Sequence, residues 1–466
     1  MTKRNIVYPY IPNTAPETKA VLMEKVKAKT EMELFDSIPA HLLQKEMNLP
    51  EPLLDEYSIR RHADNLLSQN ANLSTHKYFL GAGCAPHYVP AVVDEIIGRG
   101  ELATAYSGLM ADQGKSQIQF EYQSMMAELL DMGCMAMPQY DGGTSAGHAI
   151  RIACRITERR KVLMPKSMSP QNGEIIQNYL GGIEQSFADI EYIAFDKQTG
   201  LLDLDDLQSK LDDQTAAVFI ENPTFLGVVE TQAEQIGKLA KQAGAEFIVY
   251  ADPISLGVIE APGTYGATIA CGDIHSLGNH MSAGGGVAGY VMVKDEEAYL
   301  YQLKDQMVGA SPTSVDGEIG FSWVTAFERT SYAVREDALE FTGTNAALLS
   351  MAAGVYLALM GPQGMASIGE SIMQKSQYAA KQLAEIPGVS IQFTAPFFKE
   401  FVVDFNRTNK TVAEINQGLL QHKIFGGYDL SQSFPELGQS ALFCVTEIHT
   451  QSDIDELVET LKAMVE

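Results

Sequence analysis

The feature that most constrains the fold is a regular alternation of short apolar segments and amphipathic segments between residues 76 and 310. The apolar segments predict strands at residues 135–138, 161–165, 190–195, 216–221, 246–251, 267–271 and 287–293. The segments between them predict helices at residues 90–99, 118–130, 145–157, 204–211 and 233–243. Strands that alternate with helices indicate an α/β domain with a mostly parallel sheet covered on both faces. Ligands of such sheets bind at the carboxyl ends of the strands.

Three further regions flank this large domain. Residues 1–75 predict a mostly polar helical arm, with helices over 14–29 and 52–69 and a capping box formed by Thr14 and Glu17. Such an arm either wraps a neighbouring subunit or packs on its own chain. Residues 311–342 are less regular and form a connecting segment.

Residues 343–466 predict a smaller C-terminal α+β domain. Helices are expected over 344–359 and 361–384, strands near 389–393, 400–405 and 441–445, and a last helix over 453–465. Ser452 and Asp455 resemble a capping box at the start of that last helix.

Charge and cysteine content exclude several classes of function. The chain has 466 residues and a net charge of −26, which disfavours nucleic acid and anionic membranes as partners because both are negatively charged. No apolar run is long enough for a signal peptide or a membrane span. The five cysteines are scattered and unpaired in pattern, so we expect a cytoplasmic protein. The histidines show no metal-ligand spacing, and no metal is expected.

A glycine-rich turn predicts an anion site. Gly142, Gly143 and Thr144 follow a short predicted strand and open a predicted helix. Backbone N–H groups at a helix N-terminus face outward and favour a negative charge. The same residues are also typical of an ordinary helix cap, and this alternative stays open.

Two polar residues directly follow predicted strands. The Asn222 amide would lie at the carboxyl edge of the sheet, where it could bond a ring hydroxyl, although Asn-Pro is also an ordinary turn sequence. Asp252 follows five apolar residues, so its carboxylate needs a cationic or donor partner such as a protonated pyridine nitrogen. The alternative is that Asp252 caps the next turn. His87 and His275 lie in turns, and a structural or exposed histidine is favoured for both over acid–base catalysis.

The order of these elements resembles the large domain of pyridoxal-phosphate (PLP) enzymes with the aspartate-aminotransferase fold, known as fold type I. The resemblance implies that the glycine-rich turn binds the phosphate and that Asp252 lies under the pyridine nitrogen. It also implies a Schiff-base lysine on the turn before a glycine run. That turn contains His275 and Ser276, and no lysine occurs between Lys241 and Lys294. A chain that keeps this frame without the amine is expected to serve a partner.

Longer motifs narrow the resemblance. The segments YDGGTSA, ENPTFLGV, ADPISLGV, LALMGPQG and APFFKEFVV resemble subunit 1 of the two-subunit glycine dehydrogenase (decarboxylating), the P-protein of the glycine cleavage system. The resemblance covers residues 14–464. It implies a heterotetramer with a homologous, lysine-bearing subunit 2, and glycine decarboxylation with transfer of an aminomethyl group to a lipoyl carrier protein.

That family places the Schiff-base lysine in subunit 2, within a His-Lys-Thr stretch. The resemblance therefore implies that Ser276 replaces the lysine here and that the partner binds PLP covalently. This chain would then hold no catalytic residue. Gly142, Gly143, Thr144, Asn222, Asp252 and His275 would be cofactor-binding candidates inherited with the frame, and His275 would match the family's histidine.

Departures from the family pattern leave alternatives open. Residues 107–112 form a loop two residues shorter than usual, and residues 337–343 lack the usual polar groups. The chain could belong to a diverged paralogous complex that acts on a different amine. It could also be a structural subunit without a cofactor, or a self-standing enzyme that uses a lysine from elsewhere, such as Lys294.

Overall fold

The computed structural model describes residues 7–8, 10–11, 14–44, 48–53, 55–102, 112–181, 186–282, 287–303, 307–324 and 346–465. The chain forms two units, Met1–Ala71 and Asn72–Glu466. The loop of residues 107–111, the glycines at 284–286 and the segment 325–345 lie outside the described residues.

The first unit contains helix α1 (Pro16–Lys25), the 3₁₀ helix η1 (Glu31–Phe35) and helix α2 (Glu56–Leu67), none of which has a buried residue. The predicted capping box at the first helix is wrong. Helix α1 begins at Pro16, which needs no partner for a backbone N–H, and the Thr14 hydroxyl donates instead to the Tyr8 carbonyl.

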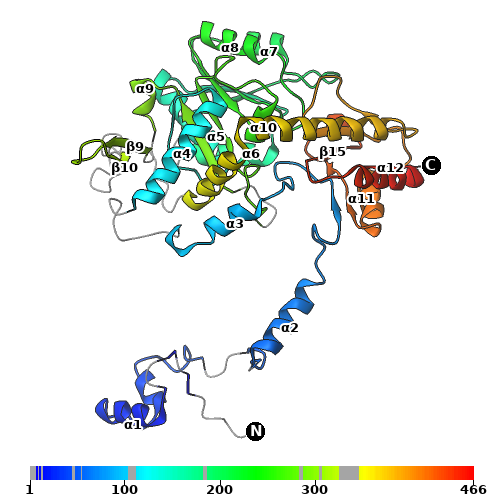
Figure 1. Cartoon of the computed structure of the whole chain (residues 1–466). Coiled ribbons are helices and arrows are strands. Elements are labelled where there is room, and N and C mark those ends of the chain that lie inside the picture. The colour runs from blue at the N-terminus through cyan, green and yellow to red at the C-terminus, as the bar shows by residue number, and fades with distance from the viewer. Residues whose placement is uncertain are drawn as a thin grey trace. The chain divides into compact units, whose positions relative to one another are not determined.

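The second unit is built on a seven-stranded sheet (Figure 1). Its strand order is β2 (Cys134–Met135), β8 (Gly289–Val293), β7 (Ile269–Asp273), β6 (Glu246–Tyr250), β5 (Thr215–Glu221), β3 (Lys161–Pro165) and β4 (Asp189–Ile193). Strands β4, β3, β5, β6 and β7 pair in parallel, and β8 is antiparallel to both of its neighbours, β2 and β7. The predicted α/β class and mostly parallel sheet are confirmed.

Both faces of the sheet are buried. In β5, Phe219 packs into a core with helices α5 (Gly142–Thr157) and α6 (Pro170–Leu180), whereas Val218 packs into a second core with α7 (Leu204–Lys210) and α8 (Ala233–Gln242). Successive strand side chains point to opposite faces, so two helix layers are needed to cover them (Figure 1). Helix α6 was not predicted, because Asn172 and Gly173 weaken its intrinsic preference.

The longest helix, α10 (Ala347–Ala384), joins the two larger sheets of this unit, the seven-stranded sheet and the four-stranded C-terminal sheet (Figure 1). It breaks at Gly361, with φ 59° and ψ 179°, so the two predicted helices are present end to end. By length and composition α10 could cross a membrane. Its buried residues from Ala352 to Ile372 pack instead in one core with α4 (Gln113–Leu130), and its last turns lie in the C-terminal core. Helix α10 is therefore a core helix.

The C-terminal part holds an antiparallel sheet of β11 (Ser390–Ile391), β12 (Glu400–Asp404), β15 (Ser440–Cys444) and β14 (Tyr428–Asp429), as the sequence predicts. Helices α11 (Val412–Gln421) and α12 (Gln451–Val465) belong to the same part of the chain. The predicted capping box of α12 is wrong by two residues. Thr450 and Asp453 form it, because α12 begins at Gln451, and Asp455 accepts from the Tyr378 hydroxyl instead.

Smaller elements complete the unit. They are β1 (Lys77–Tyr78), α3 (Ala91–Ile97), η2 (Gly100–Leu102), η4 (Pro253–Gly257), α9 (Glu297–Leu300), β9 (Met307–Pro312), β10 (Ile319–Val324), β13 (Ile424–Phe425) and η7 (Pro435–Leu437). Strand β1 pairs in parallel with β13, which places the following loop, residues 79–88, beside the C-terminal sheet.

Candidate functional site

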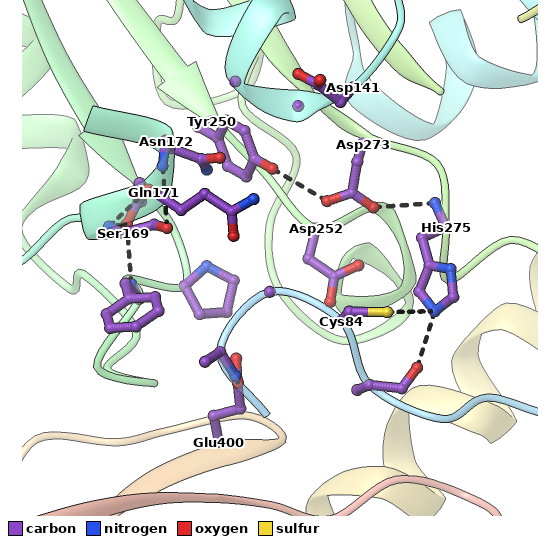
Figure 2. A pocket seen from close by; sticks show the side chains of 18 of the residues that line it. Cys84, Asp141, Ser169, Gln171, Asn172, Tyr250, Asp252, Asp273, His275 and Glu400 are labelled. Atoms are coloured by element: carbon purple, nitrogen blue, oxygen red, sulfur yellow. Dashed lines mark hydrogen bonds between the residues drawn. The ribbon is translucent and has the colours of Figure 1, made fainter. Parts of the chain in front are cut away.

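A cavity of about 170 Å³ lies at the carboxyl ends of three parallel strands, β5, β6 and β7. The residues at or just past those ends, Glu221, Asp252 and Asp273, line it. The first turns of α5 and α6 and the loop 82–85 close its sides, and Glu400 reaches it from the C-terminal part (Figure 2). Lys399 also lines it from that part. The cavity therefore occupies the position that the strand order predicts for a ligand.

Four of the six predicted site residues line this cavity: Gly142, Gly143, Asp252 and His275. Ser276 lines it as well. Thr144 and Asn222 do not. The Thr144 hydroxyl donates to the Asp141 carbonyl at 3.0 Å, and the Asn222 amide oxygen accepts from the Glu230 backbone N–H at 3.0 Å. Asn222 thus secures the loop after β5 with its amide oxygen, and it is not among the residues that line the cavity.

The cationic partner that the sequence requires for Asp252 is a side chain of this chain. Lys399 Nζ lies 2.6 Å from Asp252 Oδ2. Burial would raise the pKa of Asp252, but the Lys399 charge and hydrogen bonds from Lys399 and Ser276 outweigh it and lower that pKa. Burial would likewise lower the pKa of Lys399, and the Asp252 charge outweighs it, so the lysine pKa is raised. Both groups are therefore ionised at neutral pH.

Lys399 also contacts His87, which in turn contacts Glu447. His87 Nε2 lies 3.3 Å from Lys399 Nζ, and His87 Nδ1 lies 2.9 Å from Glu447 Oε2. The other Glu447 oxygen accepts from the Tyr88 backbone N–H at 2.7 Å. The His87 side chain is only 1% exposed, so its contacts fix it in the interior. The expectation of a structural role for His87 agrees with this placement.

Ser276 and His275 occupy the turn where the frame would carry a lysine. The Ser276 hydroxyl donates to Asp252 Oδ1 at 2.8 Å. The His275 ring contacts the Ala85 carbonyl through Nε2 at 2.9 Å, and its backbone N–H donates to Asp273 at 2.9 Å (Figure 2). Burial lowers the pKa of His275. The described part of the cavity presents one lysine, and it lies against Asp252 rather than on this turn.

The Asp141 carboxylate caps the first turn of α5. Asp141 Oδ1 accepts from the Thr144 backbone N–H at 2.7 Å, which completes a capping box. Gly142 is tightly enclosed, because a Cβ there would lie 2.1 Å from the Tyr250 hydroxyl. The helix-cap alternative for this turn is therefore observed, and a second anion would meet the Asp141 charge.

The Glu221 carboxylate lies at the start of α6 and also accepts hydrogen bonds from the backbone. It accepts from the Ser169 backbone N–H at 3.3 Å and from the Phe225 N–H at 3.0 Å. The residue is 3% exposed, and burial raises the pKa of Glu221 to about 7. Sequence reasoning did not select this residue, although a glutamate at the end of an apolar strand is a visible signal.

The lining charges decide what the cavity can hold. Its carboxyl groups are Asp141, Glu221, Asp252, Asp273 and Glu400, and Lys399 is its one lysine. PLP requires an anion seat at α5 and a free carboxylate for its pyridinium nitrogen. Asp141 accepts from the Thr144 backbone N–H at the first, so a phosphate there would lie beside a carboxylate, and Lys399 is paired with the second. The described residues therefore do not fit PLP.

Comparisons with known proteins show the family to which this chain belongs. The model of the glycine cleavage system P-protein family matches residues 8–461. A protein of Staphylothermus marinus named "Probable glycine dehydrogenase (decarboxylating) subunit 1" is 36% identical over 468 aligned positions, covering 98% of each chain. A protein of the same name from Thermococcus onnurineus is 35% identical and covers 97% of this chain and 98% of its own.

Solved structures agree. A crystal structure described as glycine decarboxylase (P-protein) of the glycine cleavage system, in inhibitor-bound form, superposes with a TM-score of 0.84 at 31% identity, covering 98% of this chain and 99% of that one. A Burkholderia pseudomallei sphingosine-1-phosphate lyase shares the fold, with a TM-score of 0.64, 15% identity and coverage of 91% and 94%. The predicted PLP fold type I is confirmed.

Proposed function

The chain belongs to the glycine cleavage system P-protein family, and on that premise we propose that it is the lysine-less subunit 1 of a glycine dehydrogenase (decarboxylating) complex. The observation that carries the proposal is the turn at Ser276, whose hydroxyl is bonded to Asp252 where the PLP frame requires an amine. The chain supports catalysis on a partner's cofactor and is inactive alone.

Lys399 does not substitute for the missing amine. A Schiff-base lysine must lose its proton before it can attack a carbonyl carbon. The pKa of Lys399 is raised because the adjacent Asp252 charge outweighs the effect of burial, so the ammonium form persists. Lys294, the other candidate, is not among the residues that line the cavity. Both observations favour a subunit over a self-standing enzyme.

The proposal assigns covalent PLP binding to a homologous, lysine-bearing subunit 2. When bound there, PLP supplies an electron sink for loss of CO2 from glycine. The aminomethyl group would then pass to a lipoyl carrier protein. This chain contributes a folded scaffold whose own cavity is lined by carboxyl groups, with Asp252 already paired with Lys399. Its five cysteines are all free, which supports a reducing, cytoplasmic location.

The test is to purify this chain alone and together with its lysine-bearing homologue, each supplied with PLP, and to reduce the samples with borohydride. Peptide mass spectrometry is expected to find the pyridoxyl group on the homologue and not on this chain. Glycine-dependent exchange of labelled CO2, with a lipoyl carrier present, is expected only from the pair. Exchange by this chain alone would overturn the proposal.

The second candidate is a paralogous complex that uses another amino acid or amine. Its support is the shortened loop 107–112 and the altered segment 337–343, most of which lies outside the described residues. Release of CO2 from a panel of labelled amino acids by the reconstituted pair separates the two. A preference for glycine supports the first candidate, and a preference for a larger amino acid supports the second.

A further inference from the structure

We propose that Lys399 is an internal ligand of the cavity, whose ammonium takes the place of a bound cation on Asp252 and holds the C-terminal sheet closed against the edge of the main sheet. This closure of the C-terminal sheet on the main sheet does not depend on which substrate the complex uses.

The ion pair joins the seven-stranded main sheet to the four-stranded C-terminal sheet. Asp252 directly follows Ala251 at the carboxyl end of β6, whereas Lys399 immediately precedes β12 of the C-terminal sheet. Their side chains are 21% and 15% exposed, so the 2.6 Å contact is shielded from most of the solvent. Charges so placed are screened by salt much less than surface charges.

Neighbouring groups are arranged around the ammonium. Ser276 donates to one Asp252 oxygen and Lys399 contacts the other, so both carboxylate oxygens are engaged. On its other side, Lys399 meets His87, which Glu447 holds in turn. These residues lie beside the main sheet, beside the C-terminal sheet and in the loop before α3. The lysine is thus bound as a ligand is bound, by several elements at once.

The adjacent Glu400 reinforces the closure. Its Oε1 accepts from the Ala82 backbone N–H at 2.7 Å, which ties the start of β12 to the loop 82–85 along the cavity wall. The backbone also approaches closely here, because a Cβ on Gly227 would lie 2.0 Å from the Glu400 carbonyl oxygen. The C-terminal sheet is therefore held on the main sheet through two consecutive residues, Lys399 just before β12 and Glu400 at its start.

If Lys399 acts as a ligand, a small amine should replace it. Lys399→Ala removes three methylenes and the ammonium, which together match n-propylammonium. Removing one partner of a buried pair leaves an uncompensated charge and is strongly destabilising. In the full-length chain we expect Lys399→Ala to lower Tm by several degrees and n-propylammonium to raise it again in a saturable manner. The wild type should show no such response.

Lys238→Ala is the matched control. Lys238 also lies 2.6 Å from a carboxylate, that of Glu234, but the side chains of this pair are 66% and 69% exposed. Its Tm is expected to change little, with no response to the amine. n-Propanol, which has the same length and no charge, should not rescue Lys399→Ala. Equal rescue by propanol, or an unchanged Tm, would overturn the proposal.

Two further measurements guard against a variant that fails to fold. Lys399→Met/Asp252→Asn removes both charges at similar volume and should be more stable than Lys399→Met, without any response to the amine. Hydrogen exchange in the loop 79–88 and in β12 should be faster than in wild type in both variants, because neither has the ion pair. Exchange as slow as in wild type in the folded double variant would contradict a closing role for the pair.

Discussion

The Ser276 hydroxyl donates a hydrogen bond to the Asp252 carboxylate over 2.8 Å, and Lys399 Nζ lies 2.6 Å from the other carboxylate oxygen. The aspartate that the fold provides for a pyridinium is thus fully engaged by this chain. The lack of an amine at position 276 and the presence of the Lys399 ammonium on Asp252 are two separate features of this chain. They make different predictions, because a lysine introduced at position 276 leaves Lys399 in place.

Ser276→Lys should not create a PLP site. Ser276 is 2% exposed, and a second ammonium there would lie near that of Lys399, with both competing for Asp252. We expect a lower Tm than wild type and no pyridoxyl label after borohydride reduction with PLP. Mass spectrometry of the full-length chain measures the label.

Ser276→Ala is the matched control for this variant. It removes one hydrogen bond to a charged acceptor, so we expect a loss of about 1.5–3 kcal/mol in the free energy of unfolding. Ser276→Lys should be less stable than Ser276→Ala. A Ser276→Lys chain that carries pyridoxyl at position 276 would refute the view that Asp252 is already occupied.

The sequence predicts the main sheet well because its signal is local. Burial on both faces requires continuous apolar runs, and these place β3 at its observed bounds and most other strands within about two residues. Helix α11 was missed although Thr411 and Glu414 form a capping box that is legible in the sequence. At this helix the capping box is a stronger signal in the sequence than the apolar periodicity.

The charges of the cavity are a different case. Asp252 could be selected because it follows a buried strand, but its partner Lys399 lies 147 positions later in another sheet (399 − 252 = 147). No local pattern links the two. Likewise, Asn222 has the position of a cofactor ligand, whereas its side chain serves the Glu230 turn. Tertiary contacts decide such side-chain roles.

Gly142→Ala should be far more damaging than Gly114→Ala. Both glycines lie in the first turn of a helix, α5 and α4 respectively. A Cβ at Gly142 would lie 2.1 Å from the Tyr250 hydroxyl, whereas a Cβ at Gly114 would meet nothing within 4 Å. Overpacking of this kind costs about 1–3 kcal/mol, while Ala in a free helical position is neutral or stabilising. Chemical unfolding of both variants measures the difference.

Removal of the opposing hydroxyl tests the cause. Tyr250→Phe combined with Gly142→Ala should recover part of the lost stability, because the closest atom in the clash is absent. If the double variant is no more stable than Gly142→Ala, the space at this turn is not what requires a glycine.

The cysteines should be unreactive in the native chain. Burial, the largest cause, raises the pKa of Cys84, Cys134 and Cys154 to about 11, and it raises the pKa of Cys271 and Cys444 well above the usual thiol value. A pKa two units above the ordinary value of 9.0 leaves about a hundredfold less thiolate at pH 8. Iodoacetamide labelling should be slow when folded and complete at five sites in denaturant. Fast labelling of any native cysteine would contradict this.

Glu221 should make the stability of the chain depend on pH between about 4.5 and 7. Its pKa rises from 4.5 to about 7 on folding, with burial as the largest cause. The folded state therefore keeps a proton that the unfolded state has lost, and the free energy of unfolding falls as pH rises through this window. At 1.36 kcal/mol per pH unit, the loss is about 3 kcal/mol and is complete above pH 7.

Glu221→Gln mimics the protonated side chain and should remove this dependence. Urea unfolding from pH 5 to pH 8 is expected to show a smaller decline than in wild type, so that the variant gains relative stability as pH rises. Glu414→Gln is a control of opposite sign. Hydrogen bonds from Thr411 lower the pKa of Glu414, so its contribution is lost as pH falls through that pKa. Parallel pH profiles for wild type and Glu221→Gln would show that Glu221 is ionised in the folded chain throughout this range.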